Sequence, residues 1–466
     1  MNIPLRNLKV TLVFTFFSLA IVMHLFLPSD ILADLTVLKK SIIQYNQEAL
    51  KKSLRSGSYR GEEGILRIGP MKGKSLGMKV YIDQTYLDSR ELFKKARASL
   101  EEAKKYMISR EKETFPGEFV QKIADSFLLY KKSRDSAQKQ IMIYRSRLNQ
   151  YIDDRLDNDL SSKIMDRLLE DSLRTTDNRL RDALGHFYNI CRGAGENRFP
   201  LTWKNVRFVN HVFLQFLERT PKEALNKYNL DRDCNYNNLK NSYDWKNIVN
   251  KPDSPYNQLL DATFNRLKDK IYNFNPLLFI SLIRNESDFD PLAISSVGAV
   301  GLTQIMPQTA KDLGMKNIYM PAYFVRAGSI MENERKMRRQ AMTALFQING
   351  RKNLDYARQA RELMQKSLNL AEKKAGLLAR YRRELLQKGN DDRFQPALAI
   401  ECGLRYFSGL MMKQKGDISL ALASYNAGPH RVEQFKGIPP YKETVRFRNR
   451  VLNYYQDYML KAKEVK

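Results

Sequence analysis

A carboxylate on the apolar face of a short helix is the feature of this sequence best suited to chemistry. Asn275 and Pro276 predict the start of a helix, because Asn caps helices and Pro suits the first turn. Along that helix Phe279, Ile283 and Glu286 recur at spacings of four and three, so Glu286 belongs to the apolar face near the helix end. Burial there would raise the carboxyl pKa and keep a proton available near neutral pH, as a general acid requires. The alternative is that Glu286 emerges at the helix end and faces solvent.

The segment that follows this helix predicts a loop built for a polar ligand. Residues 293–310 read AISSVGAVGLTQIMPQTA, in which Gly298 and Gly301 permit a tight turn and a close approach of the backbone. Gln304 offers an amide beside the apolar side chain of Met306. Such a loop suits a polar, ring-shaped ligand.

Three ordered sequence blocks carry a family resemblance. ESDFDPLAISSVGAVGLTQIMPQTA begins at Glu286, ALASYNAGPHRV spans residues 421–432, and IPPYKETVRFRNRVLNYY spans residues 438–455. In this order they resemble the soluble lytic murein transglycosylase family, whose SLT domain is similar to goose-type lysozyme. The resemblance covers roughly residues 250–458.

The resemblance assigns roles to individual residues. Glu286 matches the single catalytic acid/base, and Glu443 matches a structural acid at the start of the last helix. The positions that match cleft and substrate-lining residues are Ser295, Gln304, Met306, Tyr425 and Asn426. Two simpler roles stay open: Ser295 would only stabilise its turn, and Glu443 would only cap a helix.

Three departures from the family pattern bear on activity. Phe447 stands where the family usually supplies a Tyr whose hydroxyl approaches the catalytic carboxyl, and Thr303 stands where Met is commoner. The stretch from Met315 to Asp392 also separates the first two blocks by more residues than usual. The resemblance therefore predicts an active enzyme with an altered surrounding for its acid.

The resemblance implies a particular reaction. Glu286 would protonate the oxygen of the β-1,4 bond between N-acetylmuramic acid and N-acetylglucosamine in peptidoglycan, helped by the acetamido group of the substrate. It would then take the proton of the 6-hydroxyl group, which closes a 1,6-anhydro ring without water. The enzyme would be a carbon–oxygen lyase, with no cofactor.

Two other functions compete with this reading. Asp288 and Asp290 would supply the second carboxylate of an ordinary lysozyme-like hydrolase, although Asp290 before Pro291 is more simply a turn residue. A non-catalytic cell-wall scaffold that only grips glycan is the other alternative. A nucleic-acid-binding function is disfavoured because the sequence contains no recognition module for it.

The elements that must position these residues are predicted to be mainly α-helical. We expect a lysozyme-like catalytic domain over residues 250–460, with a helical insertion at about residues 316–392. Before it we expect a signal or transmembrane segment (1–34), an irregular linker (35–88) and a helical region (89–249).

Amphipathic periodicity predicts the helices outside the motifs. One apolar stripe contains Phe93, Ala96, Leu100, Ala103 and Met107, and we expect the helices of this region to form an antiparallel bundle. The further amphipathic stretches are residues 119–151, 161–173, 178–191, 203–219 and 331–386. The last one predicts a long helix or a helical hairpin that packs against protein. No internal sequence repeat is evident.

The N-terminus and the charge indicate the compartment. Arg6 and Lys9 precede an apolar run over residues 10–28, which predicts a membrane anchor or a signal peptide. The positive residues would keep that end in the cytoplasm and place the rest on the periplasmic side of the inner membrane, in the cell envelope. The net charge of +28 favours acidic partners, such as the stem peptides of the wall or anionic lipids, and other cell-wall proteins are possible partners.

Cysteine usage predicts no metal site. The three cysteines sit at no metal-ligand spacing. Cys191 and Cys234 either form a disulfide or remain two free thiols, and Cys402 fits a small core position.

Overall fold

The computed structural model describes residues 29–193, 199–230, 256–350 and 352–464, and these ranges are helical with a few isolated β-bridges. The expectation of a mainly α-helical chain is confirmed. The expected membrane segment at residues 10–28 lies outside the described residues. In the part of the chain that is described, no helix is both long enough and apolar enough to cross a membrane.

The helices of the first half follow the predicted pattern from residue 84 onward. They are α2 (Ser29–Arg55), α3 (Pro70–Ser75), α4 (Gln84–Ile108), α5 (Glu118–Ser146), η1 (Asp154–Leu156), α6 (Asn158–Thr175), α7 (Leu180–Arg192), α8 (Val206–Arg219) and η2 (Glu223–Lys227). The expectation of an irregular linker over residues 35–88 was wrong. Leu38 and Ile42 of α2 are fully buried, and so are Tyr59 and Ile68 in the Gly-rich stretch, because this segment packs into a core.

The second half contains the segments that carry the motifs. Its elements are α10 (Asn257–Leu267), α11 (Pro276–Ser287), α12 (Pro307–Asp312), α13 (Ala322–Gln347), α14 (Asn353–Lys388), η4 (Asp392–Phe394), α15 (Pro396–Lys413), α16 (Ile418–Ala427), α17 (Pro429–Gln434) and α18 (Lys442–Glu464). Of the two alternatives for residues 331–386, one long helix or a helical hairpin, the structure shows a hairpin, formed by α13 and α14. The domain boundaries stay a prediction.

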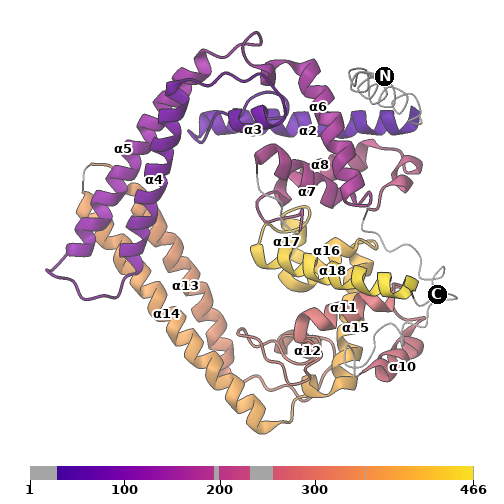
Figure 1. Cartoon of the computed structure of the whole chain (residues 1–466). Helices are drawn as coiled ribbons and strands as arrows, with labels where there is room; N and C mark the ends of the chain where they lie inside the picture. The colour runs from indigo at the N-terminus through magenta and orange to yellow at the C-terminus, as the bar shows by residue number, and fades with distance from the viewer. Residues whose placement is uncertain (1–28, 194–198, 231–255, 351, 465–466) are drawn as a thin grey trace, which may run out of the picture.

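Two long helical hairpins meet at their tips. In Figure 1 the α4–α5 hairpin and the α13–α14 hairpin run from the two ends of the molecule toward each other, so that the chain follows a ring. A shared cluster joins the tips, in which Met107 and Phe127 of one hairpin pack with Leu345 and Met364 of the other. The expectation of one antiparallel bundle for the N-terminal region was wrong, because α4 and α5 leave the other helices to make this contact.

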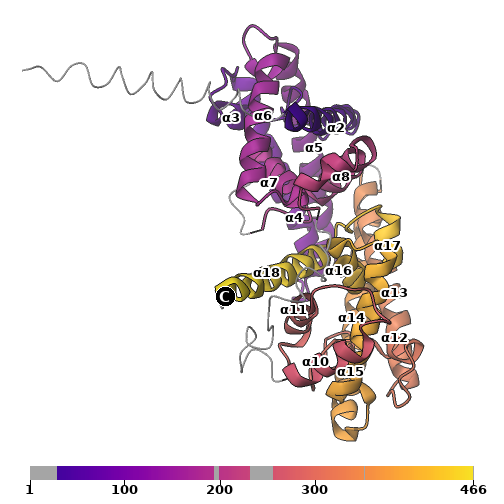
Figure 2. The same ribbon diagram turned by 90° about the vertical axis from the view of Figure 1, so that its right-hand side faces the viewer.

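Eight elements recur in the same order in the two halves, whereas η2 and α17 have no counterpart among the described residues. We call residues 29–230 the N-terminal copy and residues 276–464 the C-terminal copy; Figure 2 shows them one above the other. The matching elements are α2 and α11, α3 and α12, α4 and α13, α5 and α14, η1 and η4, α6 and α15, α7 and α16, and α8 and α18. Helix contacts match as well: α2 packs on α8 as α11 packs on α18, and α6 packs on α7 as α15 packs on α16.

A buried arginine organises the N-terminal copy. The Arg155 guanidinium pairs with Asp153, with Nη2 2.7 Å from Oδ2, and both side chains are fully buried. Its Nη1 donates to the carbonyl oxygens of Gly61 and Ile68 at 2.7 and 3.1 Å, and its Nη2 donates to the Tyr144 hydroxyl at 2.8 Å. One side chain thus ties η1 to a Gly-rich turn and to α5.

Arg393 makes the same set of contacts in the C-terminal copy. It pairs with the buried Asp391, with Nη2 2.7 Å from Oδ2, and donates to the Tyr381 hydroxyl at 2.8 Å. Its Nη1 lies 3.5 and 3.3 Å from the carbonyl oxygens of Gly298 and Ile305. The sequence showed no evident internal repeat, but the structure is a duplication in which the two copies share a matching buried network.

Buried ion pairs join the copies. Arg181 of α7 makes a two-pronged contact with Asp417 at 2.9 and 2.5 Å, and Arg448 of α18 donates to Asp182 at 2.7 Å. These four residues are at most 8% exposed. Removing one partner of such a pair leaves a buried charge uncompensated, so the interface is specific as well as tight.

Candidate active site

The proposed acid lies at the end of a short, deeply buried helix. The Asn275 side chain accepts a hydrogen bond from the Leu277 amide at 2.9 Å, and Pro276 occupies the first turn of α11, as the sequence predicts. All side chains from Pro276 to Ile283 are buried, and Glu286 is half-buried one residue before the helix ends. The apolar helix therefore holds the carboxyl group where solvation is poor.

Burial raises the pKa of Glu286 to about 8, Arg450 opposes the rise, and Glu443 adds to it. Among the described residues, no hydrogen bond or ion pair to the Glu286 carboxylate is present. A carboxyl group without a partner in a poorly solvated position keeps its proton near neutral pH. The alternative that Glu286 faces solvent at the helix end is wrong.

The loop after α11 is held by close backbone contacts. Gly301 has φ +76°, and a Cβ atom there would lie 2.0 Å from the Arg393 carbonyl oxygen. Ser287, the neighbour of Glu286, donates from its hydroxyl to the Leu302 carbonyl at 2.9 Å. The loop is therefore fixed both to η4 and to the helix that carries the acid.

Ser295 and Gln304 shape this loop. The Ser295 hydroxyl accepts from the amides of Val297 and Ala299 at 3.3 and 2.9 Å, which is the turn-stabilising role left open above. Gln304 Nε2 donates to the carbonyl oxygens of residues 293 and 301 at 3.0 and 2.8 Å. Contact of either side chain with substrate stays a prediction, as it does for Met306, which is 37% exposed at the start of α12.

Tyr425 brings α16 to the catalytic helix. Its hydroxyl donates to the Thr303 carbonyl at 2.6 Å, which fixes the ring against the loop. Burial raises the pKa of Tyr425 well above its usual value, and the neighbouring Glu286 raises it further. The next residue, Asn426, accepts a hydrogen bond from the Thr444 hydroxyl at 2.7 Å, which links α16 to α18.

Helix α18 places two charged side chains near Glu286, and the sequence motifs had not predicted that either of them acts on this residue. Glu443 and Arg450 both act on the Glu286 carboxyl, although Glu443 is exposed and was expected to have a structural role. They are seven residues apart, so they lie on one face of α18, and that spacing is the signal that could have paired them. Phe447 is buried on the same helix and its ring lies parallel to Tyr425 at 6.4 Å, where it offers no hydroxyl group.

The other nearby acids have conformational roles. Asp288 has φ +50° and ends α11, and Asp290 accepts from the Leu292 amide at 2.8 Å in a turn. Both side chains are exposed. The prediction that Asp290 is a turn residue is confirmed.

The cysteines and possible metal ligands add no chemistry to this site. Cys191 and Cys402 are buried free thiols, and burial raises the pKa of Cys402 to about 11. Cys234 lies outside the described residues. In the described ranges, no group of at least three His, Cys, Asp or Glu side chains is placed to hold a metal ion.

Comparisons with known proteins place this site in a family. Residues 264–338 and 359–445 match the model of the Transglycosylase SLT domain, and these ranges include Glu286 and the loop that follows it. The transglycosylase of Enterobacteria phage PRD1 is 39% identical over 83 residues, which make up 18% of this chain and 31% of the phage protein. The alignment therefore spans less than a third of that relative.

Two solved structures of lytic transglycosylases are also similar to the chain. One is an inactive mutant of Slt from Pseudomonas aeruginosa, 16% identical, with a TM-score of 0.25 over 85% of this chain and 54% of that one. The other is the 70 kDa soluble lytic transglycosylase of Escherichia coli, also 16% identical, with a TM-score of 0.27 over 84% of this chain and 65% of that one.

Proposed function

We propose that the chain is a lytic transglycosylase that cleaves the β-1,4 bond between N-acetylmuramic acid and N-acetylglucosamine, with Glu286 as its only acid/base. The observation that carries this proposal is a half-buried carboxyl group with a raised pKa, held at the end of α11 within an SLT domain. A group with a pKa of about 8 is protonated when substrate binds at neutral pH and can donate that proton to the leaving oxygen.

The residues around Glu286 suit the two steps of this reaction. In the first step Glu286 gives its proton to the bridging oxygen, and the acetamido group of the muramic acid stabilises the positive charge that develops on the sugar. In the second step the carboxylate takes the proton of the 6-hydroxyl group, and Arg450 stabilises the charged form in between. We propose that Ser295, Gln304, Met306, Tyr425 and Asn426 line the bound glycan.

The disposition of carboxylates favours a lyase over a hydrolase. An inverting or retaining hydrolase needs a second carboxyl group aimed at the sugar or at a water molecule. Asp290 is engaged in its own turn, and Asp288 is exposed at the end of α11. Neither acid that the sequence offered for a hydrolase is therefore placed as a second catalytic carboxyl group, and Glu443, the other carboxylate near Glu286, is exposed at the start of α18.

Product analysis tests the proposal. The purified full-length chain is incubated with peptidoglycan sacculi, and the soluble products are identified by mass spectrometry. Products that end in 1,6-anhydro-muramic acid would support the lyase. Reducing ends would identify a hydrolase, and no release by a folded protein would favour the scaffold alternative.

The rate is expected to fall in alkaline solution because the acid must start protonated. The pKa of Glu286 is raised to about 8, so the active form is present below that pH and is lost as the pH rises through it. Above that point kcat/KM should fall by about tenfold per pH unit, since each unit removes that factor of protonated carboxyl. A pH profile of product release measures this, and a rate that stays constant to about pH 10 would contradict the assignment.

Phe447→Tyr is expected to shift the alkaline limb of that profile to lower pH. A phenol donated toward the Glu286 carboxylate would stabilise its charged form and lower its pKa. The ring would keep its place, because Phe447 stacks on Tyr425. The same pH profile measures the shift, with a thermal melt to show that the variant is folded; an unchanged limb would mean that a hydroxyl here does not reach the acid.

The proposed setting is the cell envelope, on the periplasmic side, with peptidoglycan glycan strands as the substrate. The anchor at residues 10–28 remains a prediction from the sequence.

A further inference from the structure

The N-terminal copy contains a counterpart of the catalytic position. Near the end of α11, Ser287 donates to the Leu302 carbonyl at 2.9 Å, one residue after Gly301. In α2 the Asn46 side chain donates to the Ile65 carbonyl at 3.0 Å, likewise one residue after the matching glycine. The residues immediately before these two donors are Glu286 and Tyr45. The catalytic acid is therefore replaced by a tyrosine in the N-terminal copy.

The neighbours of Tyr45 repeat those of Glu286 with altered charge. Tyr188 adjoins Tyr45 as Tyr425 adjoins Glu286, and each of these two tyrosines is followed by an asparagine. Arg207 is the second residue of α8 and acts on Tyr45, as the second residue of α18, Glu443, acts on the acid. Where the C-terminal copy has two carboxylates, this copy has a phenol and a guanidinium.

A second arginine replaces the loop glutamine. Arg67 has φ +50° and Gln304 has φ +46°, and each stands directly before the residue, Ile68 or Ile305, whose carbonyl faces the buried arginine of its copy. The Nε of Arg67 is buried and has no hydrogen-bond partner within the described residues. In the N-terminal copy, the position that corresponds to Gln304 therefore holds a buried N–H group that has no hydrogen-bond partner among the described residues.

Three arginines act on Tyr45 in this cluster, and a group of positive charges of this kind favours the binding of an anion. Burial and Tyr188 raise the pKa of Tyr45, while Arg67, Arg192 and Arg207 lower it. Burial lowers the pKa of Arg67, and the neighbouring Arg192 lowers it further because the two guanidinium groups repel each other, whereas Glu62 offsets part of this effect. An incoming carboxylate would relieve that repulsion.

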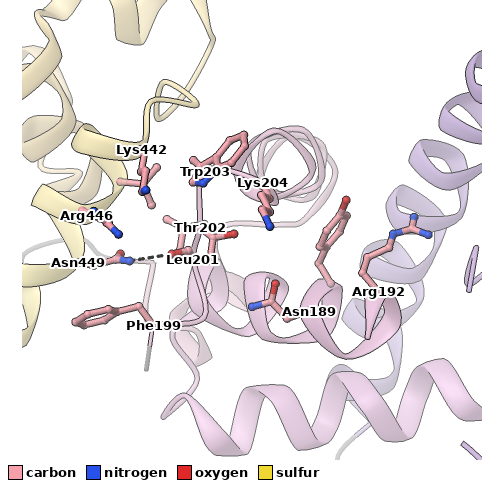
Figure 3. A pocket seen from close by; sticks show the side chains of 12 residues that line it. Asn189, Arg192, Phe199, Leu201, Thr202, Trp203, Lys204, Lys442, Arg446 and Asn449 are labelled. Carbon is pink, nitrogen blue, oxygen red and sulfur yellow. Dashed lines mark hydrogen bonds between the residues drawn. The ribbon is translucent and has the colours of Figure 1, made fainter. Parts of the chain in front are cut away.

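A basic pocket of about 730 Å³ continues from this cluster toward α18. Tyr188 and Arg192 belong to both, and Figure 3 shows Arg192 and Lys204 on one side with Lys442 and Arg446 of α18 on the other. The described lining contains no carboxylate. Its members are Tyr188, Asn189, Arg192, Phe199, Leu201, Thr202, Trp203, Lys204, Lys442, Val445, Arg446 and Asn449.

The pocket and the proposed acid share one helix. Lys442 and Arg446 are four residues apart and face the pocket, whereas Glu443 and Arg450 act on Glu286 from another face of α18.

We propose that this pocket and the adjoining arginines form a second, non-catalytic site that binds the carboxylate-bearing stem peptide of peptidoglycan. The cations match the carboxylates of the peptide, and Trp203, which is 47% exposed, offers an apolar face for the attached sugar. Tyr45 has no carboxyl group to give a proton, so ligand held here is not cleaved. The inference rests on the proposed function for the identity of the ligand.

Binding to the full-length Glu286→Gln variant tests this site without interference from cleavage. The probes are a disaccharide tetrapeptide from peptidoglycan and the same disaccharide without its peptide, titrated by calorimetry at low and high salt. We expect the tetrapeptide to bind at least about tenfold more tightly, and added salt to reduce this preference.

Charge-removing variants locate the binding. Lys442→Gln with Arg446→Gln should reduce the preference for the tetrapeptide by about tenfold, and Arg67→Gln should reduce it independently from the other end of the site. The matched control is Lys94→Gln with Arg174→Gln, since these side chains are 80% and 77% exposed and lie outside the site. Equal affinity for the two probes, or full affinity in both pocket variants, would overturn the inference. Because the variant background cannot cleave, tetrapeptide binding without 1,6-anhydro products from the wild-type chain would refute the proposed function and leave this inference standing.

Discussion

Glu286→Gln is expected to reduce release of 1,6-anhydro products by at least about a thousandfold, because the amide can neither donate nor accept the proton in the two steps. The substitution changes almost no volume, and the structure records no hydrogen bond to the carboxylate among the described residues that would be lost. Mass spectrometry of sacculus digests measures the effect. Retention of more than about a tenth of the wild-type rate would remove Glu286 from the mechanism.

The stability of the same variant provides its control. A carboxyl group whose pKa is raised by folding contributes stability below its unfolded pKa, and that contribution is lost as the pH rises through about 8. Above that pH the folded state carries the cost of an ionised, poorly solvated carboxylate, and Glu286→Gln removes this cost. The Tm of the variant should therefore exceed that of the wild type most in alkaline solution and least in acid. A Tm difference that does not vary with pH would mean that Glu286 does not carry the raised pKa.

Gly301→Ala is expected to have the second largest effect. A Cβ atom would lie 2.0 Å from the Arg393 carbonyl oxygen, a backbone atom of η4 that cannot move aside as a side chain can, and φ is +76°. Strain and overpacking together should cost about 2–5 kcal/mol of the free energy of unfolding. Since Ser295 and Gln304 belong to this loop, activity at low temperature should also fall by at least about tenfold.

Two glycines give matched controls for this substitution. Gly314 has φ +93° with nothing within 4 Å of a Cβ, so Gly314→Ala should incur only the conformational cost. Gly64 is the counterpart of Gly301, and its Cβ would lie 1.8 Å from the Arg155 carbonyl oxygen. Gly64→Ala should destabilise the chain as much as Gly301→Ala while the folded fraction retains more activity. Equal melting of the Gly301 and Gly314 variants would show that the loop relaxes.

Local sequence signals predicted the helix that carries Glu286 and the helices from α4 to α8. Each of these signals has a direct physical cause. The structure shows Asn275 as the cap of α11, a buried apolar helix before Glu286, and loop glycines with positive φ. The hairpin over residues 331–386 followed in the same way from its stripe of small apolar residues.

The duplication was missed because the spacing of apolar residues shows where helices lie but not that two sets of helices match. What the copies share is a buried polar network, and its trace in the sequence is short: Asp-Asp-Arg occurs at residues 153–155 and 391–393, and Leu-Gly-Met-Lys at residues 76–79 and 313–316. The Gly-rich stretch after Arg55 was misread for the same reason. Its order comes from the contacts of Arg155, which lies far along the chain.

The second site could not be predicted from composition. A net charge of +28 spreads over many solvated faces, and only the packing of α7 against α18 brings Arg192 and Arg446 to one pocket. Tyr45 belongs to no recognisable sequence motif. Its position becomes informative only when it is compared with the matching position of Glu286 in the other copy.

The buried ion pairs between the copies predict that the chain unfolds as one cooperative unit. A fragment that contains only the SLT domain would leave Asp417 and Arg448 without Arg181 and Asp182, with charges stranded in an apolar surface. It would also expose Ala423, Ile438 and Val445, which are part of the core of the N-terminal copy. The ring should therefore melt in a single transition, and we expect the C-terminal copy expressed alone to be less stable than the same residues within the whole chain.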